Sequence, residues 1–117
     1  MNKNEQGDIM DFEYIQVLTT VESYEDAEKI AQALLNKRLA ACIQIIGPIT
    51  SLYWWEEKIE KATEYLLLIK TKKDLYKKLE RTIIEVHPYK VPEIIANPVT
   101  GGNPEYLKWL DQEVSMP

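Results

Sequence analysis

The stretch LAACIQIIGPITSLYWWEEKIE (Leu39–Glu60) decides the fold of this chain. Residues 39–46 are apolar and strand-like, Gly47-Pro48 bends or interrupts the run, and residues 50–55 resume it with β-branched and aromatic side chains. This pattern predicts one long, kinked strand. The charged run EEKIEKATE should contain a hairpin turn, after which residues 65–71 form the returning strand.

The residues before this hairpin predict a strand followed by a helix. Residues 12–20 are rich in aromatic and β-branched side chains and contain neither proline nor glycine, which is typical of a strand. Ser23 can cap a helix, with Asp26 three residues further on. The apolar positions that follow have the spacing of one helical face: Ala27, Ile30, Ala31, Leu34 and Leu35.

The residues after the hairpin predict a second helix, a short strand and a final helix. The second helix spans about residues 72–86 and ends before Pro88. Residues 93–99 are a short strand candidate, and Asn103 can cap a last helix that has proline at its first position. The apolar stripe of this last helix consists of Leu107, Leu110 and Val114.

The predicted order of elements is strand, helix, strand, strand, helix, strand and a C-terminal helix. Right-handed crossovers then favour an α+β, ferredoxin-like split βαβ sandwich with both inner helices on one face of the sheet. The other face, which we expect to carry Tyr65 and Leu67, would leave a large apolar patch exposed on a monomer. We therefore predict a homo-oligomer.

Length, charge and cysteine content limit the possible functions. We expect one domain over residues 11–117, after a polar and disordered tail of residues 1–10. The net charge of −5 disfavours nucleic acid as a partner. The longest apolar runs have five residues, far below the ~20 that cross a bilayer, so we expect no membrane association. A lone cysteine, Cys42, and the absence of a recognisable targeting signal favour the cytoplasm.

The stretch EVHPYKVPEIIA (Glu85–Ala96) contains the only histidine, His87. Its position at a predicted helix end favours a structural role, because an imidazole there interacts well with the helix dipole. One histidine and one cysteine exclude a closed zinc site within a single chain. Symmetry in an oligomer could bring together copies of His87, or His87 with Glu85 or Glu93, so metal binding stays open.

We predict no enzymatic activity, because the sequence has no nucleophile elbow, phosphate-binding loop or dinucleotide motif. An acid–base enzyme that uses His87 is a third alternative. Cys42 lies in an apolar strand, which indicates a buried small residue rather than a reactive thiol. The aromatic run Tyr53, Trp54 and Trp55 could stack on bases, but the acidic balance favours core and subunit-interface anchors.

Three segments in order, LAACIQIIGPITSLYWWEEKIE, LLLIKT and HPYKVPEIIANPVTGGNPEYLKWL, resemble the CutA family of divalent-cation-tolerance proteins over about residues 12–114. The resemblance implies a ferredoxin-like subunit in a tight homotrimer, with the long strands pairing across subunits and the aromatic hairpin at the interface. It also implies tolerance of copper and other divalent cations, without an established reaction. The P-II signalling trimers are similar in architecture, which carries little functional weight.

The sequence departs from this family in two places. Copper ligation in bacterial relatives is attributed to a cysteine and two adjacent histidines, and the matching positions here are Thr19, Val86 and His87. Only one ligand remains, which should weaken a copper site. Glu57 stands where relatives usually have glycine, so we expect another turn at the hairpin tip.

The predicted function is that of a cytoplasmic, non-enzymatic homotrimer that needs no cofactor and binds copper or another divalent cation weakly at a subunit boundary. His87 is the candidate metal ligand. The alternative is a P-II-like sensor or interaction module whose clefts between subunits bind a small anionic ligand or a partner protein. The candidate cleft residues, each of which could instead serve packing, are Lys70, Tyr89, Glu93, Tyr106 and Trp109.

Overall fold

The computed structural model describes residues 12–115 and has the predicted order of elements. The predicted tail of residues 1–10 lies outside these residues, so its disorder stays a prediction. No helix among residues 12–115 is long and apolar enough to cross a membrane. The elements are β1 (Tyr14–Val21), α1 (Tyr24–Asn36), β2 (Cys42–Trp55), β3 (Lys58–Lys72), the 3-10 turn η2 (Lys73–Leu75), α2 (Tyr76–Val86), β4 (Ile94–Pro98) and α3 (Pro104–Ser115).

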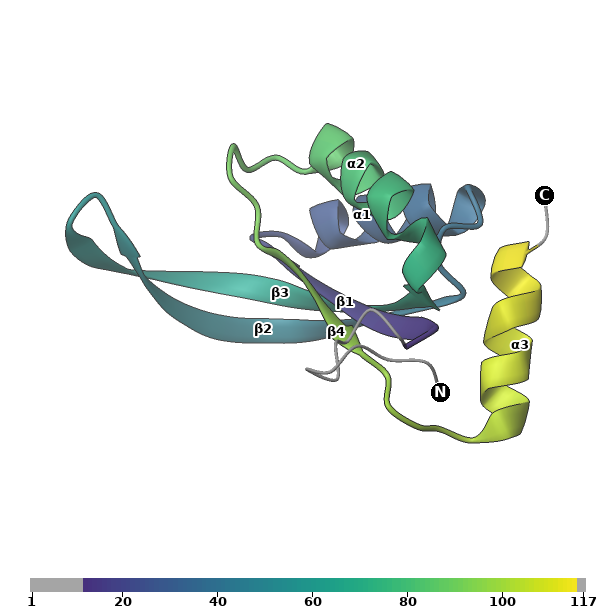
Figure 1. Cartoon of the computed structure of the whole chain (residues 1–117). Helices are drawn as coiled ribbons and strands as arrows, with labels where there is room; N and C mark the ends of the chain where they lie inside the picture. Colours follow the sequence, from purple (N-terminus) through teal and green to yellow (C-terminus); the bar gives the residue numbers. More distant parts are fainter. Residues whose placement is uncertain (1–11, 116–117) are drawn as a thin grey trace.

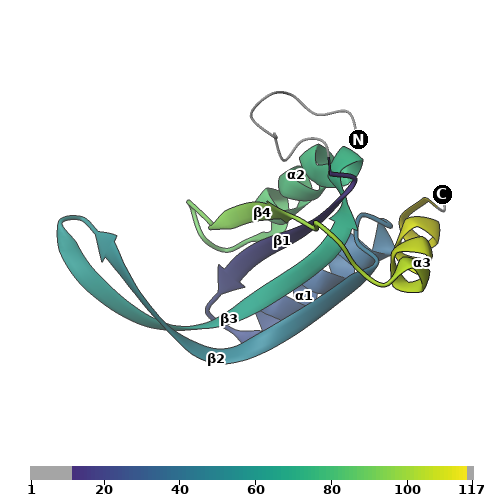
Figure 2. The ribbon, with the colours of Figure 1, turned by 60° about the horizontal axis from the view of Figure 1, so that its bottom comes forward.

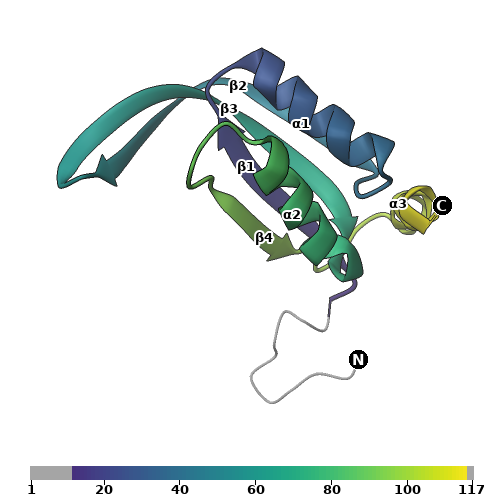
Figure 3. The ribbon, with the colours of Figure 1, turned by 90° about the horizontal axis from the view of Figure 1, so that it is seen from above.

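The four strands form one antiparallel sheet in the order β2-β3-β1-β4. Helices α1 and α2 cover the same face of this sheet (Figures 1 and 3), as the predicted topology requires. The long β2-β3 hairpin projects beyond the body of the subunit, and α3 lies at the opposite end of the sheet (Figure 2). The α+β, ferredoxin-like fold class is therefore confirmed.

The helix signals in the sequence are confirmed by the local structure. The Ser23 hydroxyl accepts a hydrogen bond from the Asp26 backbone N–H at 3.0 Å, which satisfies a donor at the start of α1. The Asn103 side chain accepts from the Glu105 N–H at 2.9 Å at the start of α3. The core between the helices and the sheet is formed by buried apolar side chains, among them Val17, Ala27, Ile30, Leu34, Leu67, Ile69, Leu79 and Ile83.

The β2-β3 hairpin is longer than predicted, because β3 already begins at Lys58. The predicted kink in β2 is present as a register shift between Ile46 and Ile49. The expected departure at the hairpin tip was wrong, because Glu56 and Glu57 both adopt positive φ angles, 49° and 67°. Two left-handed residues are what a two-residue type I′ loop requires, so the loop imposes this conformation on glutamate.

The open face of the sheet, opposite α1 and α2, carries Leu18, Leu66 and Leu68. The prediction that Tyr65 and Leu67 lie on this face was wrong. Leu67 is fully buried in the core, and the Tyr65 ring packs edge-on against Tyr24 of α1, with a centroid distance of 5.9 Å. Alternate residues of a strand point to opposite faces of the sheet, and in this part of β3 both alternating sets are apolar. The sequence therefore does not reveal which set faces the helices.

Candidate functional site

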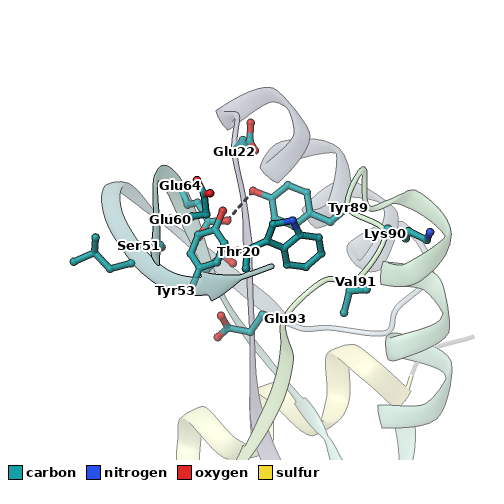
Figure 4. A pocket seen from close by; sticks show the side chains of 12 residues that line it. Thr20, Glu22, Ser51, Tyr53, Glu60, Glu64, Tyr89, Lys90, Val91 and Glu93 are labelled. Atoms are coloured by element: carbon teal, nitrogen blue, oxygen red, sulfur yellow. Dashed lines mark hydrogen bonds between the residues drawn. The ribbon is translucent and has the colours of Figure 1, made fainter. Parts of the chain in front are cut away.

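A cleft of about 760 Å³ lies between the β2-β3 hairpin, the end of β1 and the segment between α2 and β4 (Figure 4). Three parts of the chain, distant in sequence, meet there. The lining residues are Thr20, Glu22, Ser51, Leu52, Tyr53, Trp55, Glu60, Glu64, Tyr89, Lys90, Val91 and Glu93.

A hydrogen bond between Tyr89 and Glu64 joins two walls of the cleft. The Tyr89 hydroxyl donates to Oε2 of Glu64 at 2.7 Å, and the Glu64 side chain is only 7% exposed although it carries a carboxyl group. Burial raises the pKa of Tyr89 well above its usual value, and the hydrogen bond to Glu64 and the charges of Glu64 and Glu22 raise it further. The hydroxyl therefore keeps its proton and remains a donor.

His87 fixes the segment that carries Tyr89. Its ring nitrogen Nε2 lies 2.8 Å from the carbonyl oxygen of Thr20, and Nδ1 accepts the Tyr89 backbone N–H at 3.1 Å. A backbone N–H only donates and a carbonyl only accepts, so these contacts assign the neutral ring with its proton on Nε2. The two rings also lie in contact, with centroids 4.7 Å apart.

The position of His87 at the end of α2 matches the structural role weighed above. The backbone N–H of His87 donates to the carbonyl oxygen of Ile83 at 2.8 Å, and the residue then turns to an extended conformation. Both ring nitrogens are occupied, so a metal ion at His87 would have to displace either the Tyr89 amide or the Thr20 carbonyl. Metal ligation by His87 stays a prediction, and it requires the loss of one of these two hydrogen bonds.

Four carboxylates and one lysine make the cleft strongly negative. The carboxylates belong to Glu22, Glu60, Glu64 and Glu93, and none takes part in an ion pair within residues 12–115. The side chain of Lys90 points away from the Tyr89–Glu64 pair (Figure 4). This charge disfavours the small anionic ligand considered for the sensor alternative.

The carboxylates do not form a metal centre within one chain. Residues 12–115 contain no group of three or more histidine, cysteine, aspartate or glutamate side chains arranged to hold a metal ion. A divalent cation usually needs several such donors at once. A complete site would therefore require donors from a second copy of the chain.

The structure brings together only some of the predicted site residues. Tyr89 and Glu93 line the cleft, as do Tyr53 and Trp55, whereas Trp54 is 72% exposed and is not part of the lining. Lys70, Tyr106 and Trp109 are not among the residues that line this cleft of a single chain, so their place in a cleft between subunits stays a prediction.

These three residues lie nearer the other end of the sheet, toward α3. Lys70, near the C-terminal end of β3, donates to the side-chain oxygen of Gln44 in β2. The rings of Tyr106 and Trp109 in α3 are in contact, with centroids 5.5 Å apart. Burial and a hydrogen bond with the Cys42 side chain raise the pKa of Tyr106. Within one chain, these contacts lie at the α3 end of the subunit, and the choice between packing and a cleft role for the three residues stays open.

The sequence interpretation missed Glu22, Glu60 and Glu64. Glu60 and Glu64 belong to the charged run EEKIEKATE, which resembles an exposed turn, whereas both lie within β3. The signal that could have revealed the position of Glu64 within the sheet is the pairing of β2 with β3, because Glu64 lies opposite the apolar Ile49. A carboxyl group at such a position requires a buried partner.

Comparison with known proteins gives consistent matches. The sequence profile of the CutA1 divalent ion tolerance protein matches residues 15–113. The chain is 48% identical over 94 residues to the divalent-cation tolerance protein CutA of Thermus thermophilus, with 80% of this chain and 91% of that protein covered. It is 50% identical over 86 residues to protein CutA of Mus musculus, covering 74% of this chain but 49% of that protein. The chain thus spans about half the length of the mouse relative.

Solved structures agree with these matches. The CutA1 structure from Ehrlichia chaffeensis superposes with a TM-score of 0.85 at 34% identity, covering 91% of this chain and 99% of that one. The structure of the periplasmic divalent cation tolerance protein CutA from Archaeoglobus fulgidus gives a TM-score of 0.84 at 40% identity, covering 86% and 98%.

Proposed function

Because the chain belongs to the CutA1 divalent ion tolerance family, we propose that it acts in tolerance of divalent cations as a cytoplasmic, non-enzymatic homotrimer. The observation that carries this proposal is the family match over residues 15–113, which spans every strand of the sheet but the first residue of β1. Its relatives are named as tolerance proteins and not as enzymes. Both ring nitrogens of the only histidine are occupied, which gives no support to an acid–base role.

Two apolar surfaces support assembly with further copies of the chain. The open face of the sheet carries leucines from β1 and β3, and the hairpin exposes Leu52, Trp54 and Ile59 at 67%, 72% and 64%. Contiguous apolar surface of this kind is unusual on a monomer and is typical of protein interfaces. In the proposed trimer these surfaces are buried between subunits.

A metal site in the proposed trimer would combine donors from two subunits. Each chain contributes carboxylates at its cleft, and carboxylate oxygens bind divalent cations. No cysteine lines the cleft and both ring nitrogens of His87 are occupied, so the affinity for copper is expected to be weak. The negative charge of the cleft supports the binding of a cation, and the absence of a group of three metal-binding side chains within residues 12–115 supports weak binding that is completed at a subunit boundary.

A calorimetric copper(II) titration of the chelator-stripped protein tests this proposal, with native mass recorded on the same samples. We expect binding to a trimer that is weakened by a Glu22→Gln, Glu60→Gln double variant. The same titration of the His87→Ala variant tests separately whether the imidazole is a metal ligand. A monomer, or a trimer that binds no divalent cation, would contradict the proposal.

A second candidate function is that of a small-ligand sensor, and the size and lining of the cleft favour it. Its volume of about 760 Å³ is in the range of small-molecule sites, and its lining includes the aromatic side chains of Tyr53, Trp55 and Tyr89. A thermal-shift screen separates the two functions, because a bound ligand raises the unfolding temperature. Stabilisation by a small molecule but by no metal ion would favour the sensor.

A further inference from the structure

Within residues 12–115, Glu64 is a buried carboxylate without a cationic partner. It is 7% exposed, and the only donor within residues 12–115 that reaches it is the neutral hydroxyl of Tyr89. Removing a carboxylate from water is costly unless positive charge or several hydrogen bonds compensate it. One hydrogen bond compensates only part of this cost, so the cleft is prepared for a group that brings positive charge.

The surroundings of Glu64 add to this negative potential. Glu22 and Glu60 lie on the same side of the cleft as the Tyr89–Glu64 pair (Figure 4), and the one lining lysine points away from it. Nothing in the described part of the chain neutralises these side chains by an ion pair. The potential therefore favours a cation at this position.

The aromatic lining favours an organic cation over a metal ion. Tyr53, Trp55 and Tyr89 line the same cleft, and aromatic faces attract organic cations through cation–π interactions. No group of three metal-binding side chains lies in the described residues, which makes the cleft of a single chain a poor metal site. A guanidinium group fits best, since it is flat, stacks on aromatic rings and donates parallel N–H groups to a carboxylate.

A series of hydrogen bonds supports the site from beneath. His87 connects the Thr20 carbonyl to the Tyr89 backbone, and the Tyr89 hydroxyl connects to Glu64. This series of contacts crosses from β1 through the segment after α2 to β3. A carboxylate held in advance loses little conformational freedom when a ligand binds, which favours affinity.

We infer that this cleft binds a guanidinium group, which pairs with the Glu64 carboxylate and lies against the aromatic wall formed by Tyr53 and Trp55. The inference rests on the second candidate function, a ligand-binding cleft, and names its ligand chemistry. The guanidinium group belongs either to a free small molecule or to an arginine side chain of a protein. His87 is a positioning residue in this site and does not contact the ligand.

The test is a calorimetric and NMR titration of the trimer with L-arginine and with L-citrulline, its neutral analogue of nearly the same shape. Arginine should shift the Glu64 and Tyr89 amide resonances, and citrulline should not. Glu64→Gln should weaken arginine binding about tenfold or more, because a hydrogen bond to a charged group is lost. The matched control is Glu28→Gln, which removes the same charge from the exposed surface of α1.

Arginine blocked at both ends distinguishes the two sources of the group. Blocking removes both the α-carboxylate, which the acidic cleft repels, and the α-ammonium, which it attracts, and leaves the guanidinium as the one charged group, so tighter binding of the blocked form supports a protein-borne arginine. Equal or tighter binding of free arginine supports a small molecule, and either result supports a guanidinium site. If Glu64→Gln does not fold, Tyr89→Phe tests the same pair, since it removes the hydroxyl that holds Glu64.

Equal binding of arginine and citrulline, or an equal loss in the Glu28 control, would overturn the inference. If arginine shifts neither amide but another compound does, the guanidinium site is refuted and the ligand-binding cleft stands. If no compound in the screen shifts them, the second candidate function fails as well.

Discussion

Replacement of His87 should reveal whether this residue is a structural connector or a metal ligand. The ring is 7% exposed and satisfies the Thr20 carbonyl and the Tyr89 N–H at the same time. His87→Ala leaves both backbone groups without these partners. Each unsatisfied buried polar group costs about 1–3 kcal/mol, and water can reach the less buried Tyr89 amide, so we expect a loss of about 2–4 kcal/mol.

Two further variants of His87 separate the two hydrogen bonds. The side-chain oxygen of His87→Asn can still accept the Tyr89 N–H, as Nδ1 does, and the side-chain amide of His87→Gln can still donate to the Thr20 carbonyl, as Nε2 does. Each should therefore recover part of the stability lost in His87→Ala. The assay is urea unfolding at a fixed subunit concentration, because the stability of an oligomer depends on concentration.

The same three variants should be titrated with copper(II). A positioning role predicts that copper binding follows the stability of the variants, with Asn and Gln close to the wild type. A stabilising role of the two hydrogen bonds is refuted if His87→Ala unfolds at the wild-type urea concentration. The positioning role is refuted if all three variants lose copper binding equally while Asn and Gln remain stable, since that result identifies the imidazole as a ligand.

Three other substitutions test separate features of the fold by urea unfolding. Glu57→Gly should stabilise the protein by about 0.5–1 kcal/mol, because the left-handed φ of 67° suits glycine. Gly47→Ala should destabilise it by about 1–3 kcal/mol, because the new Cβ would clash with the ring of Tyr65. The control is Gly101→Ala, whose Cβ would meet no atom within 4 Å and should leave the packing unchanged. The hydrogen bond that Lys72 donates to the Asp111 carboxylate raises the pKa of Lys72 above its unfolded value, so this pair stabilises the fold below about pH 10.4 and the effect is lost as pH rises further. Asp111→Asn should reduce that alkaline loss.

The helices could be predicted because their signals are local. The Ser23 cap and the spacing of the apolar residues in α1 depend only on neighbouring positions, and both were confirmed. The hairpin length could not be predicted in this way. The start of β3 projects beyond the helices, where both faces are exposed and charged residues are tolerated, so its sequence resembles a loop.

The face of the sheet was predicted wrongly for a physical reason. Leu66 and Leu67 are equally apolar, so composition does not distinguish them. Leu67 pairs with Thr19 of β1, which is fully buried, and paired residues point to the same face, so Leu67 faces the helices. The conformation of Glu57 was missed for a similar reason, because loop length imposes a positive φ that residue identity disfavours.

The candidate site was predicted in part. Tyr89 and Glu93 follow α2 in a proline-containing segment, and the structure places both at the cleft. Glu64 was missed because its burial depends on Tyr89, which is 25 residues away in the sequence. Contacts of this kind arise from the topology of the sheet and have no signature in either segment alone.

The most direct test of the proposed tolerance function is growth in graded copper(II) of copper-sensitive cells that lack their own relative of this chain. The wild-type chain and the Glu22→Gln, Glu60→Gln double variant should be expressed at equal levels and shown to have the same native mass. The account predicts that the wild type raises the copper concentration that stops growth and that the variant raises it less. Growth that is unchanged by the wild-type chain would contradict the proposed function.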